Sequence, residues 1–127
     1  MHELFRQRAN AKILAFVESR KRNENLSLWP MDVYVRRSAR MCGKCFDVAN
    51  IVVASRYQRH GYATAFFVEA EKIAREHKLG LYVECVGNKH LRRLLERLGY
   101  GLVHACEYSP SYIKPYPSIK NDITPNG

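Results

Sequence analysis

The chain has 127 residues, 46% hydrophobic and 26% charged, which is long enough for one domain with a single core. Its formal net charge of +9 favours phosphorylated cofactors, nucleic acid or acidic protein surfaces as partners, although a basic surface without a dedicated partner also fits. No apolar run approaches the roughly 20 residues that span a membrane, and the first residues carry charges where a signal peptide is apolar. We therefore expect a cytoplasmic protein that does not enter a membrane.

The first half of the chain predicts one helix and two strands. Apolar residues at roughly helical spacing indicate a helix from residue 3 to about 22, and residues 23–25 are expected to end it. The expected apolar stripe of this helix comprises Leu4, Ala11, Leu14, Ala15 and Phe16 or Val17. Alternating apolar residues predict a strand over 31–40. An apolar run predicts a second strand over 46–54, with 51–54 covered on both faces.

The cysteines favour structural positions over a metal site. Cys42 and Cys45 form a C-x-x-C pair, but a structural zinc site normally needs a second pair at short spacing, and Cys85 and Cys106 stand apart. The segment 42–45 instead predicts a tight hairpin turn whose first central residue is its glycine. We expect no bound metal.

The second half continues as helix, strand, helix and strand, at about 62–78, 81–86, 89–98 and 100–107. Four of the five prolines follow residue 108, which predicts an irregular tail with a short strand near Tyr112. This order predicts an α/β (α+β) fold in which helices flank a mixed central sheet. The expected organisation is one domain over 1–108 and a Pro- and Tyr-containing tail over 109–127.

A strand, a basic turn and a helix follow one another in residues 51–67. The N–H groups at a helix N-terminus have no intrahelical partners and lie at the positive end of the helix dipole, so they bind anions. Gly61 allows a ligand to approach the backbone closely, and Arg56, Arg59 and His60 add charge or hydrogen-bond donors. The segment predicts a site for a phosphorylated cofactor.

Four landmarks in order resemble the GNAT superfamily of N-acetyltransferases. Residues 58–63, Gln-Arg-His-Gly-Tyr-Ala, resemble its Q/R-x-x-G-x-G/A motif after an apolar strand. Glu84 lies inside the next strand, Asn88 opens the following helix, and Leu-Gly-Tyr at 98–100 ends it. The resemblance covers residues 46–108 and implies an acetyl-CoA-dependent N-acetyltransferase.

The resemblance implies where acetyl-CoA would bind. In the family, the turn and helix start hold the pyrophosphate, the preceding strand splays from its neighbour and pairs with the pantetheine arm and acetyl carbonyl, and the Asn contacts the pantetheine arm. The matching residues are Gln58, Arg59, His60, Gly61, Tyr62, Ala63 and Thr64, then Ile51, Val52 and Val53 on the strand, and Asn88.

The resemblance also suggests the catalytic groups. Glu84 is the expected base, because family members that acetylate protein N-terminal amines carry Glu on the equivalent strand, although a charged residue on a solvent-facing strand is the alternative. Asp47 and His90 are the alternative candidates for the catalytic base. Many relatives protonate the leaving thiolate with a Tyr seven residues after the Asn, and here that position is Leu95.

A substitute for that missing acid would be Tyr108, with Tyr100, Tyr112 or water as alternatives. Because the usual acid is missing, the alternative remains that the protein is catalytically inactive and binds CoA or a partner protein.

The predicted N-terminal half is shorter than is usual in the family. Relatives usually have an extra strand before the first helix and three consecutive strands before the turn, whereas this sequence predicts a helix at once and then two strands. An N-terminally trimmed domain would leave the acceptor site open or complete it with a second subunit of a homodimer. That arrangement slightly favours a protein over a small-molecule amine as acceptor. Nucleic acid is the less favoured partner, because the tail aromatics fit core packing equally well.

Overall fold

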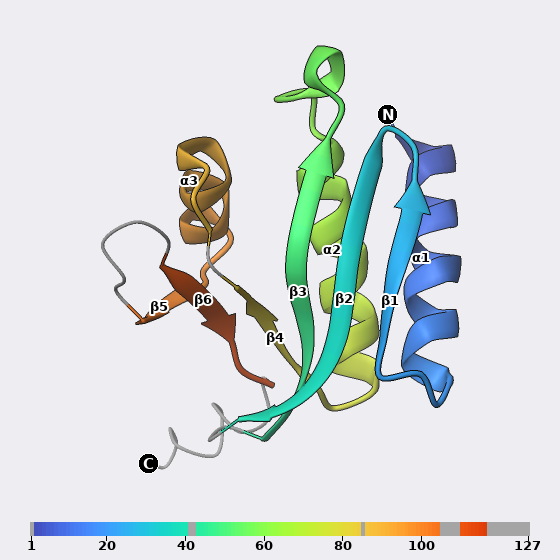
Figure 1. Ribbon diagram of the computed structural model, residues 1–127, viewed down its shortest axis with the longest axis vertical. Coiled ribbons are helices and arrows are strands. Elements are labelled where there is room, and N and C mark those ends of the chain that lie inside the picture. The colour runs from blue at the N-terminus through green and yellow to red at the C-terminus, as the bar shows by residue number, and fades with distance from the viewer. Residues whose placement is uncertain (1, 41–42, 85, 105–109, 117–127) are drawn as a thin grey trace.

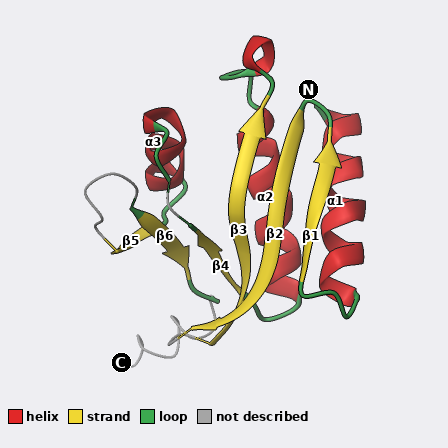
Figure 2. Cartoon of the chain, viewed as in Figure 1, coloured by secondary structure: helices red, strands yellow, loops and turns green. Residues whose placement is uncertain are grey.

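The computed structural model describes residues 2–40, 43–84, 86–104 and 110–116, which form three helices and a six-stranded mixed sheet (Figure 1; Figure 2). The elements are α1 (Glu3–Glu18), β1 (Asn23–Leu28), β2 (Met31–Arg40), β3 (Gly43–Val53), a 3-10 turn (Ser55–Tyr57), α2 (Tyr62–Glu76), β4 (Gly80–Val83), α3 (Lys89–Arg97), β5 (Gly101–His104) and β6 (Ser111–Lys114). No helix in these residues is long and apolar enough to cross a membrane.

The sheet has the strand order β1-β2-β3-β4-β6-β5, and β3 and β4 form its parallel pair. The other neighbours are antiparallel, so the predicted mixed sheet with flanking helices is confirmed. α1 and α2 lie side by side behind β1, β2 and β3 in Figure 1, whereas α3 stands beside the far half of the sheet.

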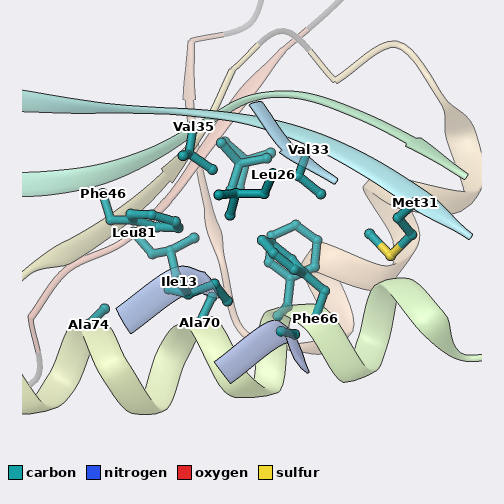
Figure 3. Packing of buried hydrophobic residues seen from close by; sticks show 14 of the residues in the cluster. Ile13, Leu26, Met31, Val33, Val35, Phe46, Phe66, Ala70, Ala74 and Leu81 are labelled. Atoms are coloured by element: carbon teal, nitrogen blue, oxygen red, sulfur yellow. The ribbon is translucent and has the colours of Figure 1, made fainter. Parts of the chain in front are cut away.

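The core lies between α1, α2 and the sheet. Figure 3 shows Ile13 and Phe66 from the helices pointing toward Val33, Val35 and Phe46 of the sheet. Of the apolar stripe predicted for α1, Phe16 is buried, but the other buried residues of this helix are Phe5, Ala9 and Ile13, which were not predicted. The predicted Leu4 is 76% exposed. α1 has apolar residues on several sides, so contact with β1 and α2 decides which side is buried.

Strand β1 is absent from the sequence-based prediction, which expected a helix to about residue 22 and two strands before the turn. α1 ends at Glu18, and three consecutive strands precede the turn. Asn and Ser at alternate positions of β1 gave a weak strand signal. Antiparallel pairing with β2 along the whole of β1, from Asn23↔Arg36 to Leu28↔Met31, makes this segment a strand and buries Leu26 and Leu28.

The hairpin between β2 and β3 also differs from the expected one. Arg40 pairs with Gly43, so the connection is at residues 41–42, which lie outside the described residues, as do Cys85 and Cys106. Gly43 and Lys44 belong to β3 rather than to a two-residue turn. The register is set by the buried apolar residues of both strands, because a shift by one residue would turn them to the other face.

The short strand predicted near Tyr112 is present as β6, and it lies inside the sheet between β4 and β5. The sheet therefore continues beyond residue 108, where an irregular tail was expected. Its pairing with both neighbours explains the position: Tyr112 is opposite Val83 of β4 and Leu102 of β5.

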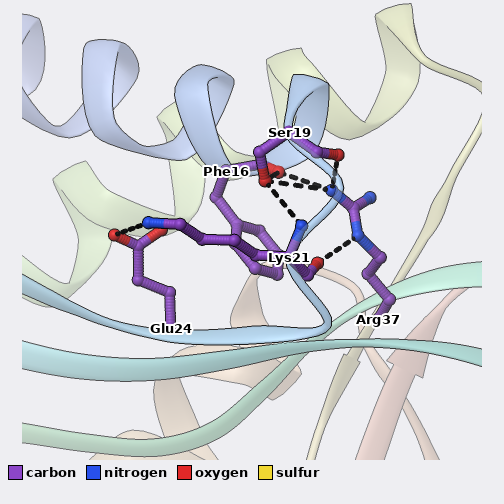
Figure 4. Close-up of polar contacts among 5 residues, drawn as sticks. All are labelled: Phe16, Ser19, Lys21, Glu24 and Arg37. Carbon is purple, nitrogen blue, oxygen red and sulfur yellow. Dashed lines mark hydrogen bonds and ion pairs between the residues drawn. The ribbon is translucent and has the colours of Figure 1, made fainter.

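Polar contacts of Arg37 tie the loop after α1 to β2 (Figure 4). Its guanidinium donates to the carbonyl oxygens of Phe16 at 2.6 Å and Ser19 at 2.5 Å, and its Nε donates to that of Lys21 at 2.6 Å. These bonds satisfy the free carbonyl groups that every helix C-terminus leaves. They fix α1 against the sheet at the end opposite to the turn before α2.

Candidate functional site

Strands β3 and β4 separate halfway along β3. Their pairing runs from Cys45↔Gly80 to Val48↔Val83, and the Glu84 N–H donates to the Val48 carbonyl oxygen at 3.0 Å at the point of separation. β3 continues to Val53, still paired with β2 but no longer with β4. This splay leaves one edge of β3 available to a ligand, as the family resemblance implied.

The end of β3 departs from the expectation that 51–54 is covered on both faces, because Val52 is 53% exposed. The Ala54 N–H donates to the Pro30 carbonyl oxygen at 2.8 Å, which points it toward β2. Since backbone groups alternate along a strand, those of Val53 point toward the gap. The side-chain amide of Gln58 donates to the Val53 carbonyl oxygen at 3.0 Å, so Gln58 folds the turn back onto β3.

The turn ends at Gly61, which caps α2 with a φ of 89° and gives no side-chain hydrogen bond. The first intrahelical bond of α2 runs from the Ala65 N–H to the Gly61 carbonyl oxygen at 3.0 Å. The N–H groups of Tyr62, Ala63 and Thr64 therefore have no acceptor within the helix. Such groups at the positive end of a helix dipole can bind a phosphate oxygen.

A cleft of about 660 Å³ lies between the splayed edge of β3, the start of α2 and α3. It is lined by Ile51, Val52, Val53, Tyr57, Gln58, Arg59, Gly61, Tyr62, Ala63, Thr64, Asn88, His90, Leu91, Arg93, Leu94 and Arg97. Every predicted cofactor-binding residue except His60 is among them. The carbonyl oxygen of His60 lies 2.7 Å from the imidazole Nε2 of His2.

The wall formed by α3 is the part of the cleft that sequence reasoning missed. Leu91 and Leu94 were expected to lie together on one side of this helix, and both line the cleft. Arg93 and Arg97 are one helical turn apart and also line it, so they and Arg59 provide positive charge around the cavity. Their i, i+4 spacing was visible in the sequence, but the position of α3 beside the cleft was not.

Asn88 begins α3 as predicted. Its side-chain oxygen accepts a hydrogen bond from the Leu91 N–H at 3.0 Å, which is the usual geometry of an N-cap. The residue thereby fixes the first turn of α3 at the edge of the cleft, where His90 is exposed.

The expected base, Glu84, does not line the cleft. Its carboxylate forms an ion pair with Arg36 and lies 3.8 Å from the Arg40 guanidinium. Its side chain is 21% exposed and begins where β3 and β4 separate. The expected base is therefore held beside two arginines rather than on the lining of the cleft.

The two reserve bases differ sharply in environment. Asp47 is fully buried and accepts hydrogen bonds from Ser38 at 2.6 Å and Arg40 at 2.7 Å, which gives it a structural role. His90 lies in the first turn of α3 and lines the cleft. Within the described part of the cleft, the imidazole of His90 is therefore a proton-transfer group accessible from the cavity.

The tyrosines considered as proton donors lie elsewhere. Tyr100 donates to Glu71 at 2.9 Å and Tyr112 donates to Glu96 at 3.0 Å, and neither lines the cleft. Burial, together with the neighbouring carboxylate, raises the pKa of each hydroxyl above its ordinary value. Leu95 is fully buried in the core, and Tyr108 lies outside the described residues.

Comparison with known proteins agrees with this geometry. The model of the acetyltransferase (GNAT) family matches residues 4–100. The chain belongs to the GNAT acetyltransferase family. A comparison with curated protein sequences gave no significant match.

Two solved structures share the fold of this GNAT-family chain. One is the crystal structure of AtaTR bound with AcCoA, which is 16% identical, with a TM-score of 0.56 over 74% of this chain and 62% of that one. The other is a mutant AtaT toxin bound to the C-terminus of the antitoxin AtaR and acetyl-CoA, also 16% identical, with a TM-score of 0.54 over 71% and 61%. The chain thus spans about three fifths of the length of these proteins.

Proposed function

We propose that this protein transfers the acetyl group of acetyl-CoA to an amine of a protein or small-molecule acceptor. The observation that carries the proposal is the cleft at the β3–β4 splay, which gathers the free edge of β3, the uncapped start of α2 and Asn88. The cavity falls within the range of about 300–1,000 Å³ typical of ligand pockets.

We expect acetyl-CoA to lie in this cleft with its pyrophosphate at the start of α2. Its pyrophosphate would accept hydrogen bonds from the N–H groups at the start of α2, with Arg59, Arg93 and Arg97 around its phosphates. Its pantetheine arm would lie along the free edge of β3, between the apolar side chains of Ile51 and Leu91. The acetyl group would then reach the point where β3 and β4 separate.

The proposed reaction is a direct attack. The acceptor ammonium loses a proton to Glu84, or through water to His90, and the neutral amine forms an N–C bond to the acetyl carbonyl carbon. Backbone N–H groups on the free edge of β3 stabilise the negative oxygen of the tetrahedral intermediate. The C–S bond then breaks, the nitrogen gives up its second proton to form the neutral amide, and the thiolate takes up a proton to leave as CoA. With Tyr108 outside the described residues and Leu95 buried, we propose water or His90 as the proton source.

A catalytically inactive protein that binds CoA or a partner is the second candidate. It is favoured by Leu95, which replaces the usual acid with a buried apolar side chain, and by the ion pairs that occupy Glu84. This candidate predicts binding of acetyl-CoA without release of CoA in the presence of amines.

Calorimetry with acetyl-CoA and a CoA-release assay with a panel of amines test both candidates. We expect binding by the wild type and by Glu84→Gln, and at least about a hundredfold lower turnover for Glu84→Gln, as is typical for loss of a general base. His90→Ala is the matched variant in the cleft. Binding without turnover would favour the inactive protein, and no binding at millimolar acetyl-CoA would contradict acetyl transfer and a CoA-binding role, leaving only an inactive protein that binds a partner.

A further inference from the structure

A row of mostly charged residues lies on the sheet face opposite α1 and α2, which we call the open face, although Asp47 and Tyr82 of this row are buried. The strand register places Arg36 beside Asp47 and Asp47 beside Tyr82. Val48, the residue after Asp47 in β3, is buried in the core under the helices. Because successive side chains of a strand point to opposite faces, the side chains of this row point away from the helices. Glu84, two residues beyond Tyr82, lies on the same face by the same alternation.

The row reaches the proposed site of acetyl transfer. The main chain of Glu84 makes its contact with Val48 at the end of the β3–β4 pairing, and the free edge of β3 begins just beyond it. The Glu84 side chain therefore begins at the point where β3 and β4 separate. An acceptor that approaches the acetyl group from the open face would meet this carboxylate and its partners.

The two arginines of the row are held very differently. The Arg40 guanidinium donates to the buried Asp47 at 2.7 Å, and its carbon lies 3.6 Å from the centre of the Tyr82 ring. Arg36 is 40% exposed and pairs with Glu84, and no other carboxylate of the described residues lies within 4.0 Å of it. Arg40 is thus a fixed part of the sheet, whereas Arg36 is free to change partner.

The row has no net charge, because the two positive side chains balance the two negative ones: Arg36, Arg40, Asp47 and Glu84. This balance affects which charges on an acceptor are favoured. An acceptor ammonium that pairs with Glu84 competes with Arg36 for this carboxylate and weakens their ion pair. Water screens part of the Arg36 charge, because its side chain is 40% exposed, so the loss of this pair has a modest cost. A carboxylate on the same acceptor would give Arg36 a new partner. A zwitterionic acceptor would then form two ion pairs, one with Glu84 and one with Arg36, in place of the single pair between these residues.

We propose that Arg36 selects acceptors that carry a carboxylate close to the reacting amine, as it exchanges Glu84 for the carboxylate of the acceptor. The proposal rests on the proposed acetyl transfer and names the substrate class of that site. Two sources share this chemistry: a free amino acid, and a protein or peptide whose N-terminal residue is Asp or Glu. The bidentate geometry of a guanidinium suits a carboxylate from either source.

The experiment compares acceptors that carry this carboxylate with their uncharged amide counterparts. Glycine and glycinamide represent the free amino acids, and a pentapeptide that begins with Asp and its twin that begins with Asn represent the peptides. For each pair, CoA release gives kcat/KM, and calorimetry with CoA-loaded protein gives the affinity without any turnover. The variants are Arg36→Gln and, as a control for net charge, Arg20→Gln, whose exposed side chain lies in the loop after α1.

We expect the wild type and Arg20→Gln to prefer the carboxylate member of at least one pair by tenfold or more. Arg36→Gln should lose this preference, measured as the ratio between the two members of a pair, whatever its absolute rate. Equal binding of both members by the wild type, no binding of either, or a preference that survives in Arg36→Gln would overturn the proposal. Selective binding without CoA release would support carboxylate recognition and contradict the proposed acetyl transfer.

Discussion

The imidazole Nε2 of His2 lies 2.7 Å from the carbonyl oxygen of His60, so the start of α1 holds the turn that precedes α2. The His2 ring also contacts the ring of Tyr62, with 4.2 Å between their centres. These residues are far apart in the sequence, and their contact stabilises the turn before any ligand arrives. A preorganised turn lowers the entropy cost of binding.

Gly61→Ala should weaken acetyl-CoA binding about tenfold and lower the free energy of unfolding by about 1–2 kcal/mol, because the left-handed conformation at a φ of 89° disfavours a Cβ. The added Cβ would also lie 3.2 Å from the His2 imidazole. Calorimetry and urea unfolding measure the two effects. Gly43→Ala is the control: Gly43 also has a positive φ, but it is distant from the cleft, so only stability should fall. Equal loss of affinity in both variants would contradict a role of the turn in binding.

Arg93→Ala and Arg97→Ala should each weaken acetyl-CoA binding about three- to tenfold, which corresponds to ~0.7–1.4 kcal/mol, because each removes a cation from the cleft wall. The effect should shrink as salt rises, since exposed charges are screened. Calorimetry at two ionic strengths gives the measurement. Arg20→Ala removes the same charge at the other end of the molecule, and an equal effect there would mean that net charge alone matters.

Asp47→Ala should lower the free energy of unfolding by about 2–3 kcal/mol, because it leaves Arg40 without its 2.7 Å partner. The loss should be smaller than for a fully buried pair because a third of Arg40 reaches water. Urea unfolding measures it, with the exposed Asp32 of the same strand pair as the matched control. A neutral result for Asp47→Ala would show that the row of charges does not support the sheet.

Tyr100→Phe should lower the free energy of unfolding by about 1 kcal/mol near pH 8, because it removes the hydrogen bond to Glu71. The raised pKa of Tyr100 means that the folded state holds this proton more tightly than the unfolded state. The resulting stability is complete below the ordinary tyrosine pKa of about 10 and falls as the pH rises above it. Wild type should therefore lose stability above pH 10 more steeply than Tyr100→Phe. Parallel curves from unfolding at several pH values would contradict this assignment.

Several features of the cleft were predictable because they depend on local sequence. The left-handed turn at Gly61, the start of α2 after it and the N-cap of α3 at Asn88 each follow from residues next to one another in the chain. Motif spacing then identified the GNAT family, which the match over residues 4–100 confirms.

Other features depend on contacts between distant segments. β1 becomes a strand through its pairing with β2, despite residues with weak strand preference. β6 lies between β4 and β5, although it follows both in the chain. Glu84 looked like an isolated carboxylate in an apolar run, whereas the sheet places Arg36 and Arg40 beside it. None of these neighbours is indicated by local periodicity.

The sequence by itself determined the glycine-containing turn before α2, because backbone conformation at a glycine and free N–H groups at a helix start are local properties. Tertiary structure alone decided that α3 adds Arg93 and Arg97 to the cleft. It also decided that the expected base is held by arginines on the open face. Charges interact through space, so their effect depends on which strands and helices the fold brings together.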